Sequence, residues 1–308
     1  MLLHEENGGT LVRSDSRQRV LSAIQHQPVE KIPKGELCID DGVIKKELGC
    51  DIVGFEERLE FVERLGVDLV CLSPKNGSGE GIPEYREVIW EDIERWTRDT
   101  SLFSFALLDG PFGWGIRSLG FERFITLHAR SPLNLVGLIE RVEALNVKLS
   151  EILVEQGIDG IIIADDIAYN RGLLVSPRVL REYFLPSLER QVEAIAKRGI
   201  PVFFHSDGNY SEVIADLVEI GFKGVHCIDR NADMDVVALQ QAYGKTLCLW
   251  GTLDVADLAK ADDEMYLAEL IDRIEGLGSR GGFILGTTSG LFEGIDIRGL
   301  MRVYHAVK

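Results

Sequence analysis

Two apolar runs decide the fold, Gly157-Ile-Asp-Gly-Ile-Ile-Ile163 and Gly199-Ile-Pro-Val-Phe-Phe204. Each has the composition of a buried strand, and each is followed directly by polar residues. The segment between them is long enough for a helix, so the two runs predict a parallel strand–helix–strand unit. In such units ligands bind at the carboxyl ends of the strands, which is where these polar residues lie.

The rest of the chain repeats this alternation of apolar runs and helical patterns. The further runs are residues 35–39, 68–73, 104–108, 221–226, 246–250 and 282–286. Eight strand–helix units in roughly 270 residues predict an α/β fold, a single (β/α)8 TIM barrel. A doubly wound open sheet is the alternative. It has little support as a dinucleotide-binding fold, because no Gly-x-Gly-x-x-Gly follows the first run.

The barrel is predicted to span residues 14–308 as one domain with an N-terminal helical extension. Residues 1–13 are predicted to be a flexible tail, and residues 15–27 show the 3–4 spacing of a helix face. The Gly-rich segment 76–81 lacks the Gly-Lys-Ser/Thr ending of a P-loop, so it is predicted to be a flexible lid or turn.

Composition narrows the class of protein. The net charge of −17 argues against nucleic-acid binding, because each phosphate contact would oppose the field of the protein. The five cysteines form no Cys-x-x-Cys pair and mostly lie in apolar runs, as expected of buried residues in a reducing compartment. Neither a signal peptide nor a membrane span is expected. These features predict a cytoplasmic protein.

Acidic residues gather at the predicted strand ends, where lysine and arginine are scarce. Such a mouth favours a ligand with hydrogen-bond donors or positive charge, for example the amidine-like edge of a pterin. Neighbouring residues on a strand point to opposite sides, so at most one of Asp165 and Asp166 lines the mouth. The strand-end residues are Glu36, Asp40, Ser73, Asp109, Asp165, Asp166, His205, Asp207, Asp229, Asp254 and Thr287–Ser289.

His205 is the residue best suited to general acid–base chemistry near neutral pH. With Asp207 it could also supply two metal ligands, but zinc needs a third. No Cys or His stands at the end of the eighth predicted strand, where the sequence reads Thr287-Thr-Ser-Gly-Leu291. No metal is therefore expected.

Several short motifs, taken as a set, resemble the uroporphyrinogen decarboxylase superfamily from about residue 17 to the C-terminus. They are Asp165-Asp-Ile-Ala-Tyr-Asn-Arg-Gly172, Ser176-Pro177, Arg181-Glu-Tyr183, Pro186, His205-Ser-Asp-Gly-Asn209, Tyr243-Gly244 and Gly251-Thr-Leu-Asp254. The resemblance implies a (β/α)8 barrel, which agrees with the strand count.

The superfamily contains two main chemistries. Its decarboxylases hold the carboxylates of a tetrapyrrole with an arginine-bearing N-terminal segment, whereas this chain has Pro33-Lys-Gly-Glu-Leu-Cys38 there, without arginine. Its other branch moves methyl groups to or from a corrinoid protein. Members of that branch that methylate a thiol carry zinc on His-x-Cys and a later Cys, positions that correspond here to His205, Asp207 and the 289–291 region. Both thiolates are missing.

The resemblance therefore implies a methyltransferase whose acceptor is not a thiol, because zinc serves there to make the acceptor thiolate. We expect transfer of a methyl group from a methylated corrinoid protein to N5 of tetrahydrofolate. The alternatives are a zinc-dependent methylcorrinoid:thiol methyltransferase, a divergent tetrapyrrole decarboxylase and a non-catalytic binding protein. The expected catalytic residues are His205 and Asp207, and the expected substrate-binding residues are Glu36, Asp165, Asp166, Asn170, Asn209 and Asp254.

Overall fold

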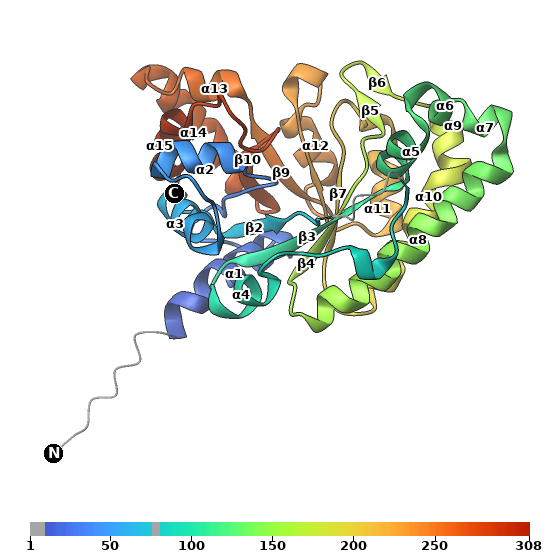
Figure 1. The fold of residues 1–308 in the computed structure, drawn as a ribbon. Helices are drawn as coiled ribbons and strands as arrows, with labels where there is room; N and C mark the ends of the chain where they lie inside the picture. The colour runs from blue at the N-terminus through green and yellow to red at the C-terminus, as the bar shows by residue number, and fades with distance from the viewer. Residues whose placement is uncertain (1–9, 76–80) are drawn as a thin grey trace.

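A computed structural model describes residues 10–75 and 81–308. Parallel strands form one eight-stranded sheet in the order β1-β2-β3-β4-β7-β8-β9-β10. Bridges from Lys34 to Leu285 and from Ile39 to Leu291 join its two edges, so the predicted TIM barrel is confirmed (Figure 1). The strands are β1 (Gly35–Glu36), β2 (Leu69–Leu72), β3 (Phe103–Asp109), β4 (Gly160–Ala164), β7 (Val202–His205), β8 (Gly224–His226), β9 (Cys248–Leu253) and β10 (Phe283–Thr287).

Helices surround the barrel and return the chain from the end of one strand to the start of the next (Figure 1). Their apolar stripes pack on the outer face of the sheet, as the spacing in the sequence predicts. The main ones are α3 (Phe55–Leu65), α4 (Ile93–Asp99), α8 (Pro132–Glu155), α10 (Leu185–Ala196), α11 (Ile214–Ile220), α12 (Val236–Tyr243), α14 (Glu264–Gly278) and α15 (Ile297–Ala306).

The strands alternate between two hydrophobic cores, one inside the barrel and one under the helices. The inner core is aromatic: the rings of Phe105 and Trp250 stack at 5.6 Å, and Phe203 packs edge-on against both. Large inward side chains fill the lumen of a TIM barrel. The interior of this barrel is likewise a packed core and not a pore. The mouth above it therefore has a rigid apolar floor.

Helix α1 (Thr10–Ile24) closes the opposite end of the barrel. Its residues Val20, Ala23 and Ile24 belong to the inner core, and Arg17 pairs with Asp159 at 3.0 Å. The helix begins earlier than residue 15, where the sequence pattern started. Residues 1–9 of the predicted tail, and residues 76–80 of the predicted lid, lie outside the described residues.

Additional short elements follow the strands at the mouth and were not predicted. Helix α2 (Asp41–Leu48) follows β1, three helices follow β3, and α13 (Val255–Ala259) follows β9. A hairpin of β5 (Ala168–Tyr169) and β6 (Gly172–Leu173) follows β4 (Figure 1). The helices after β3 are α5 (Pro111–Leu119), α6 (Phe121–Ile125) and α7 (Leu127–Arg130).

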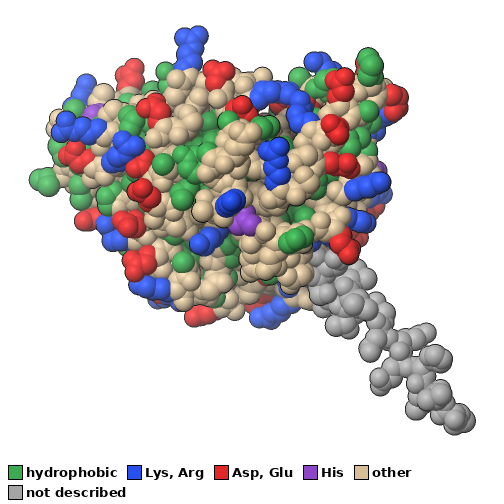
Figure 2. Space-filling model, turned by 180° about the vertical axis from the view of Figure 1, so that it is seen from behind, with side chains coloured by type: hydrophobic (Ala, Val, Ile, Leu, Met, Phe, Trp, Pro, Cys, Tyr) green, Lys and Arg blue, Asp and Glu red, His purple; other side chains and the backbone are tan. Residues whose placement is uncertain are grey.

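The surface carries both signs of charge. On the face in Figure 2, acidic and basic side chains are interspersed, so the net charge of −17 is not concentrated there. Within the described residues, no helix combines the length and apolarity needed to cross a membrane.

Candidate active site at the barrel mouth

The loop after β7 is fixed against the loop after β4. The Ser206 hydroxyl accepts a hydrogen bond from the backbone N–H of Ile167 at 3.1 Å, and the N–H of Asn209 donates to the Tyr169 carbonyl at 2.9 Å. Gly208 has a φ of +81°, and a Cβ there would lie 2.6 Å from the Tyr169 backbone. Glycine is therefore needed at this position for the two loops to touch.

This contact brings together three side chains, Asp166, His205 and Asp207, here called the acceptor cluster. His205 Nε2 lies 3.8 Å from Asp166 Oδ1 and 3.9 Å from Asp207 Oδ1. The backbone N–H of Asp207 donates to Asp166 Oδ1 at 2.9 Å. His205 is buried, whereas the Asp166 and Asp207 side chains are 59% and 65% exposed. The cluster therefore opens toward solvent.

Burial and neighbouring charges shift the pKa values of this cluster in opposite directions. Burial lowers the pKa of His205, although the Asp166 and Asp207 carboxylates oppose it, so the imidazole is neutral near pH 7. Burial raises the pKa of Asp207, while His205 and a hydrogen bond with the Cys227 thiol act to lower it. In the described part of the chain, neither carboxylate is ion-paired with a lysine or arginine.

The other ring nitrogen of His205 contacts a second histidine. His205 and His226 are paired residues at the ends of β7 and β8. Their Nδ1 atoms lie 2.9 Å apart, and His226 Nε2 lies 3.1 Å from the Thr287 carbonyl oxygen. The His226 ring packs against Trp250 with centroids 4.8 Å apart, on the floor of the mouth.

Asp165 and Asp166 point to different environments, as the alternation of side chains predicted. Asp165 is buried, and its Oδ1 accepts from the N–H groups of Phe112 and Gly113 at 2.7 and 3.2 Å, at the start of α5. A Cβ at Gly110 would lie 2.2 Å from this carboxyl group. Asp165 therefore anchors α5, and Asp166 is the member of the pair that faces the mouth.

Asp254 lies in another part of the mouth, in a group with Arg230 and Asp257 that we call the paired cluster. Asp254 accepts from the Asp257 N–H at 2.9 Å and caps α13, and its other oxygen contacts Arg230 Nη2 at 2.5 Å. Arg230 also reaches Asp257, which is fully buried and accepts from Tyr266 Oη at 2.6 Å. The carboxylates of this cluster already have cationic partners.

Glu36 is buried at the end of β1, in a pocket of hydrogen-bond donors. The backbone and side chain of Thr287 and the hydroxyl of Tyr304 all donate to its carboxyl group. Burial outweighs these bonds and raises the pKa of Glu36 to about 7. The residue can thus hold or release a proton near neutral pH.

The two predicted asparagines lie near the acceptor cluster. Asn170 is exposed in the turn between β5 and β6. The Asn209 side-chain oxygen accepts from the N–H and hydroxyl of Ser211 at 3.1 and 2.6 Å, which fixes the turn after β7.

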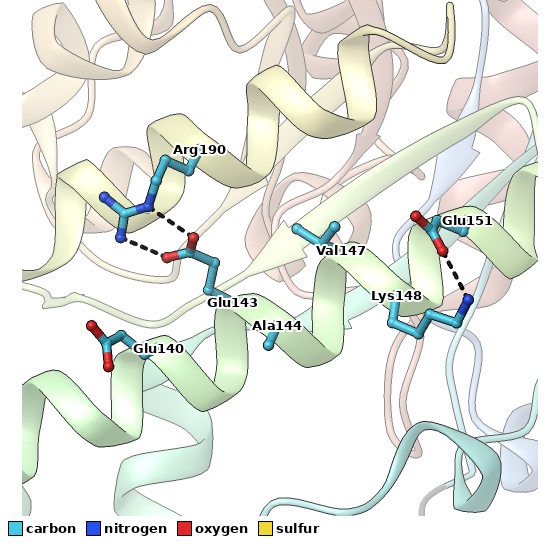
Figure 3. Close-up of a pocket in the computed structure, with 7 residues that line it drawn as sticks. All are labelled: Glu140, Glu143, Ala144, Val147, Lys148, Glu151 and Arg190. Carbon is cyan, nitrogen blue, oxygen red and sulfur yellow. Dashed lines mark hydrogen bonds and ion pairs between the residues drawn. The ribbon is translucent and has the colours of Figure 1, made fainter.

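A cavity of about 700 Å³ lies at the ends of β1 and β2, and none of the three residues of the acceptor cluster lines it. Glu36, Cys38 and Asp40 line it, and Cys38 is close enough for the charge of Asp207 to help raise the pKa of its thiol. A separate groove of about 540 Å³ lies between α8 and α10 (Figure 3). Surface ion pairs such as Arg190–Glu143, at 2.7 Å, line that groove, and no strand end reaches it.

The acceptor cluster also meets the spacing for a metal ion, since its donor atoms all lie within 4.8 Å of one another. It offers one imidazole nitrogen and two carboxylate oxygens, a donor set that suits harder divalent cations better than a thiolate-rich zinc site does. Asp166 is a possible third metal ligand. In the sequence, a third ligand was considered only after the eighth strand, at residues 287–291. That no metal is bound stays a prediction.

Sequence reasoning missed His226 and Arg230. His226 was predicted only as a strand residue. Its position at the end of the strand after the one that His205 ends could have indicated that the two side chains meet. Arg230 had no such signal, because its contacts to Asp254 and Asp257 join two separate loops.

Comparison with known proteins places the chain in a family. The fold is similar to a methyltransferase from Methanosarcina mazei at 16% identity, covering 94% of this chain and 97% of that one with a TM-score of 0.71. It is also similar to a B12-independent methionine synthase from Shewanella sp. W3-18-1 at 14% identity, with 92% and 96% coverage and a TM-score of 0.58. No curated protein matches the sequence. The model of the uroporphyrinogen decarboxylase (URO-D) family matches residues 95–308, and the chain belongs to that family.

Proposed function

We propose that this protein is a methyltransferase that moves a methyl group from a methylated corrinoid protein to N5 of tetrahydrofolate. The observation that carries the proposal is the acceptor cluster, in which a buried imidazole and two carboxylates with no lysine or arginine partner among the described residues face the mouth. Such a group favours a substrate atom that carries a proton and gains positive charge as it reacts. N5 of tetrahydrofolate is such an atom.

The proposed step is a direct displacement. The N5 lone pair attacks the methyl carbon, and the electron pair of the cobalt–carbon bond stays on cobalt, which leaves as Co(I). Methylated N5 then carries a positive charge and loses its proton to His205 Nε2. Asp166 and Asp207, both within 4 Å of that nitrogen, stabilise the charge on N5 and then on the imidazolium. Most of the remaining catalysis is positioning.

The cavity at the ends of β1 and β2 supports a folate-sized substrate at the mouth. Its volume of about 700 Å³ falls within the about 300–1,000 Å³ that is typical of small-molecule sites. The carboxyl group of Asp40 on its wall can accept from the donor edge of a pterin, whereas Asn170 and Asn209, which follow β4 and β7, do not line it.

Exposed apolar side chains support a protein partner at the mouth. Within the described residues, each large hydrophobic side chain that is strongly exposed lies between the end of a strand and the first turn of a following helix, which is the mouth side. They come from several loops around the mouth, where a docked protein could cover them together. These residues are Ile52, Ile89, Phe121, Leu133, Tyr169, Val237, Val255, Met265 and Phe292.

One observation favours a second candidate, a metal-dependent methylcorrinoid:thiol methyltransferase. The spacing of Asp166, His205 and Asp207 could hold a divalent cation, which would polarise the acceptor thiol when bound. The donor set opposes it, because the cluster contains no sulfur ligand. A tetrapyrrole decarboxylase is less favoured, since a substrate with several carboxylates would be repelled by this mouth.

The test is to mix the metal-stripped protein with methylcob(III)alamin and tetrahydrofolate under anaerobic conditions and follow the corrinoid spectrum. We expect cob(I)alamin to appear with tetrahydrofolate and not with a thiol. A silent spectrum with tetrahydrofolate, together with turnover of a thiol after zinc is restored, would establish the second candidate instead. Release of carbon dioxide from an acidic tetrapyrrole would contradict both.

A further inference from the structure

We infer that His226 is a positioning residue, which holds His205 in the tautomer that carries its proton on Nδ1 and presents the Nε2 lone pair to the mouth. The inference follows from the hydrogen-bond chain that runs from the Thr287 carbonyl through His226 to His205. It rests on the proposed function only for the identity of the substrate atom that meets the lone pair.

The direction of each hydrogen bond in this chain is fixed from its far end. A carbonyl oxygen only accepts, so the proton of the His226 ring lies on Nε2, 3.1 Å from the Thr287 oxygen. In a neutral ring, Nδ1 of His226 then has a lone pair. It can form the 2.9 Å contact with His205 only by accepting from His205 Nδ1–H. His205 Nε2 is left without a proton.

Burial favours, for both histidines, the neutral state that this chain requires. His226 is fully buried, and burial together with the nearby His205 lowers its pKa well below the ordinary value. The pKa of His205 is lowered as well, again mainly by burial. An additional proton, which would place a positive charge on the buried histidine pair, is therefore disfavoured.

Rigid surroundings keep His226 in place. The Tyr210 hydroxyl donates to the carbonyls of His226 and Cys227 at 3.2 and 3.0 Å, and Trp250 packs against the ring. The Thr287 residue that accepts from His226 is itself bonded to Glu36. Such second residues commonly fix the tautomer of a functional histidine.

The resulting site pairs a lone pair with two carboxylates less than 4 Å away. A donor or a positive charge placed between these three acceptors is attracted by all of them. The site is thus arranged to take an N–H group that becomes cationic, and to remove its proton.

Nitrogen NMR of the ¹⁵N-histidine-labelled protein tests the inference without any assumption about the reaction. His205→Gln identifies the His205 signals by their loss. We expect wild-type His205 to show a protonated Nδ1 and an unprotonated Nε2. A proton on Nε2 in the wild-type protein would overturn the inference, even if no variant of His226 folds.

Two substitutions then assign the effect to His226. His226→Asn keeps an acceptor oxygen near the place of Nδ1, and His226→Leu removes it. We expect the asparagine variant to keep the wild-type tautomer and the leucine variant to move the His205 proton to Nε2. An unchanged His205 spectrum in a folded leucine variant would also overturn the inference.

Turnover adds a second readout. We expect His226→Leu to lower kcat by about 10- to 100-fold, the usual effect of losing a residue that orients another, and His226→Asn to restore most of it. Loss of turnover in both variants with the wild-type tautomer intact would contradict a positioning role. If the wild-type protein forms no cob(I)alamin, the proposed function fails while the NMR result still decides the tautomer.

Discussion

The acceptor cluster after β4 and β7 and the paired cluster around β9 have the same acidic character and lie at the same end of the barrel. They differ in whether cations accompany the carboxylates. Asp254 and Asp257 contact Arg230, and Arg273 also reaches Asp257, whereas within the described residues no lysine or arginine pairs with Asp166 or Asp207. Aspartates at corresponding places on the barrel can therefore differ in their surroundings and in their accessibility to a ligand.

The two clusters differ in whether the carboxylates bind other parts of the protein or are exposed to a ligand. In the paired cluster, the hydrogen bonds connect the loops after β8 and β9 to α14, so the free energy of the interaction contributes to the fold. In the acceptor cluster, the carboxylates are more than half exposed, and their charge is available to a ligand. Carboxylates that lack a cation in a concave site indicate function better than acidity alone does.

The largest expected effect is on the acceptor cluster. Replacing His205 with Gln removes the proposed base, and we expect methyl transfer to fall by about 10²- to 10⁴-fold. Urea unfolding should show only the cost of losing the His205–His226 hydrogen bond, about 1 kcal/mol, which is too small to explain such a loss of turnover in a folded protein. A variant that keeps full turnover would exclude His205 as the base.

The paired cluster should respond in the opposite way. Asp257→Ala removes the buried carboxylate that Arg230 and Arg273 share, so that Arg230 keeps only its contact with Asp254. We expect a loss of about 3 kcal/mol in the free energy of unfolding. That is the lower end of the cost of breaking a buried pair, since both arginines are half exposed. Below its melting temperature, the variant should turn over at the wild-type rate. Strong loss of activity in a folded protein would mean that this cluster takes part in the reaction.

Glu36 provides an intermediate case, a buried carboxyl group with donors but no cation. Its pKa rises from 4.5 to about 7 on folding, so the folded state binds the proton more tightly. The resulting stability is fully present below pH 4.5 and is lost as the pH rises through 7. It amounts to about 3 kcal/mol at most. Urea unfolding at pH 5 and pH 8 should show this decline in the wild type and not in Glu36→Gln. Equal declines in both would assign it to other groups.

The smallest effect is expected in the groove between α8 and α10 (Figure 3). Glu143→Gln breaks the pair with Arg190, whose side chain is 53% exposed. Exposed pairs of this kind contribute about 1 kcal/mol or less, so melting temperature and turnover should change little. A large effect on turnover would show that the groove is coupled to the mouth.

The fold could be predicted from the sequence because each barrel strand is a short apolar run between turns. The runs at 157–163 and 199–204 became β4 and β7 within a few residues. The short helices at the mouth could not be predicted in this way. Helix α5, for example, begins where the buried Asp165 accepts from its first N–H groups, a contact between residues more than 50 positions apart.

The same distinction applies to the site. His205 and Asp207 could be placed at the mouth because they follow a strand directly, and the alternation of side chains showed that Asp165 and Asp166 must separate. Whether a carboxylate is free or paired depends on other loops. Arg230, which engages Asp254, and His226, which contacts His205, come close through the closure of the barrel and not through any spacing in the sequence.

The most direct test compares one carboxylate from each cluster in the same assay. Asp207→Asn and Asp254→Asn are matched changes, and each removes one negative charge from the mouth. With methylcob(III)alamin and tetrahydrofolate, we expect cob(I)alamin formation to fall about 100-fold or more in Asp207→Asn and to stay near the wild-type rate in Asp254→Asn. Wild-type turnover in Asp207→Asn, or equal losses in the two variants, would contradict the assignment of the reaction to the acceptor cluster.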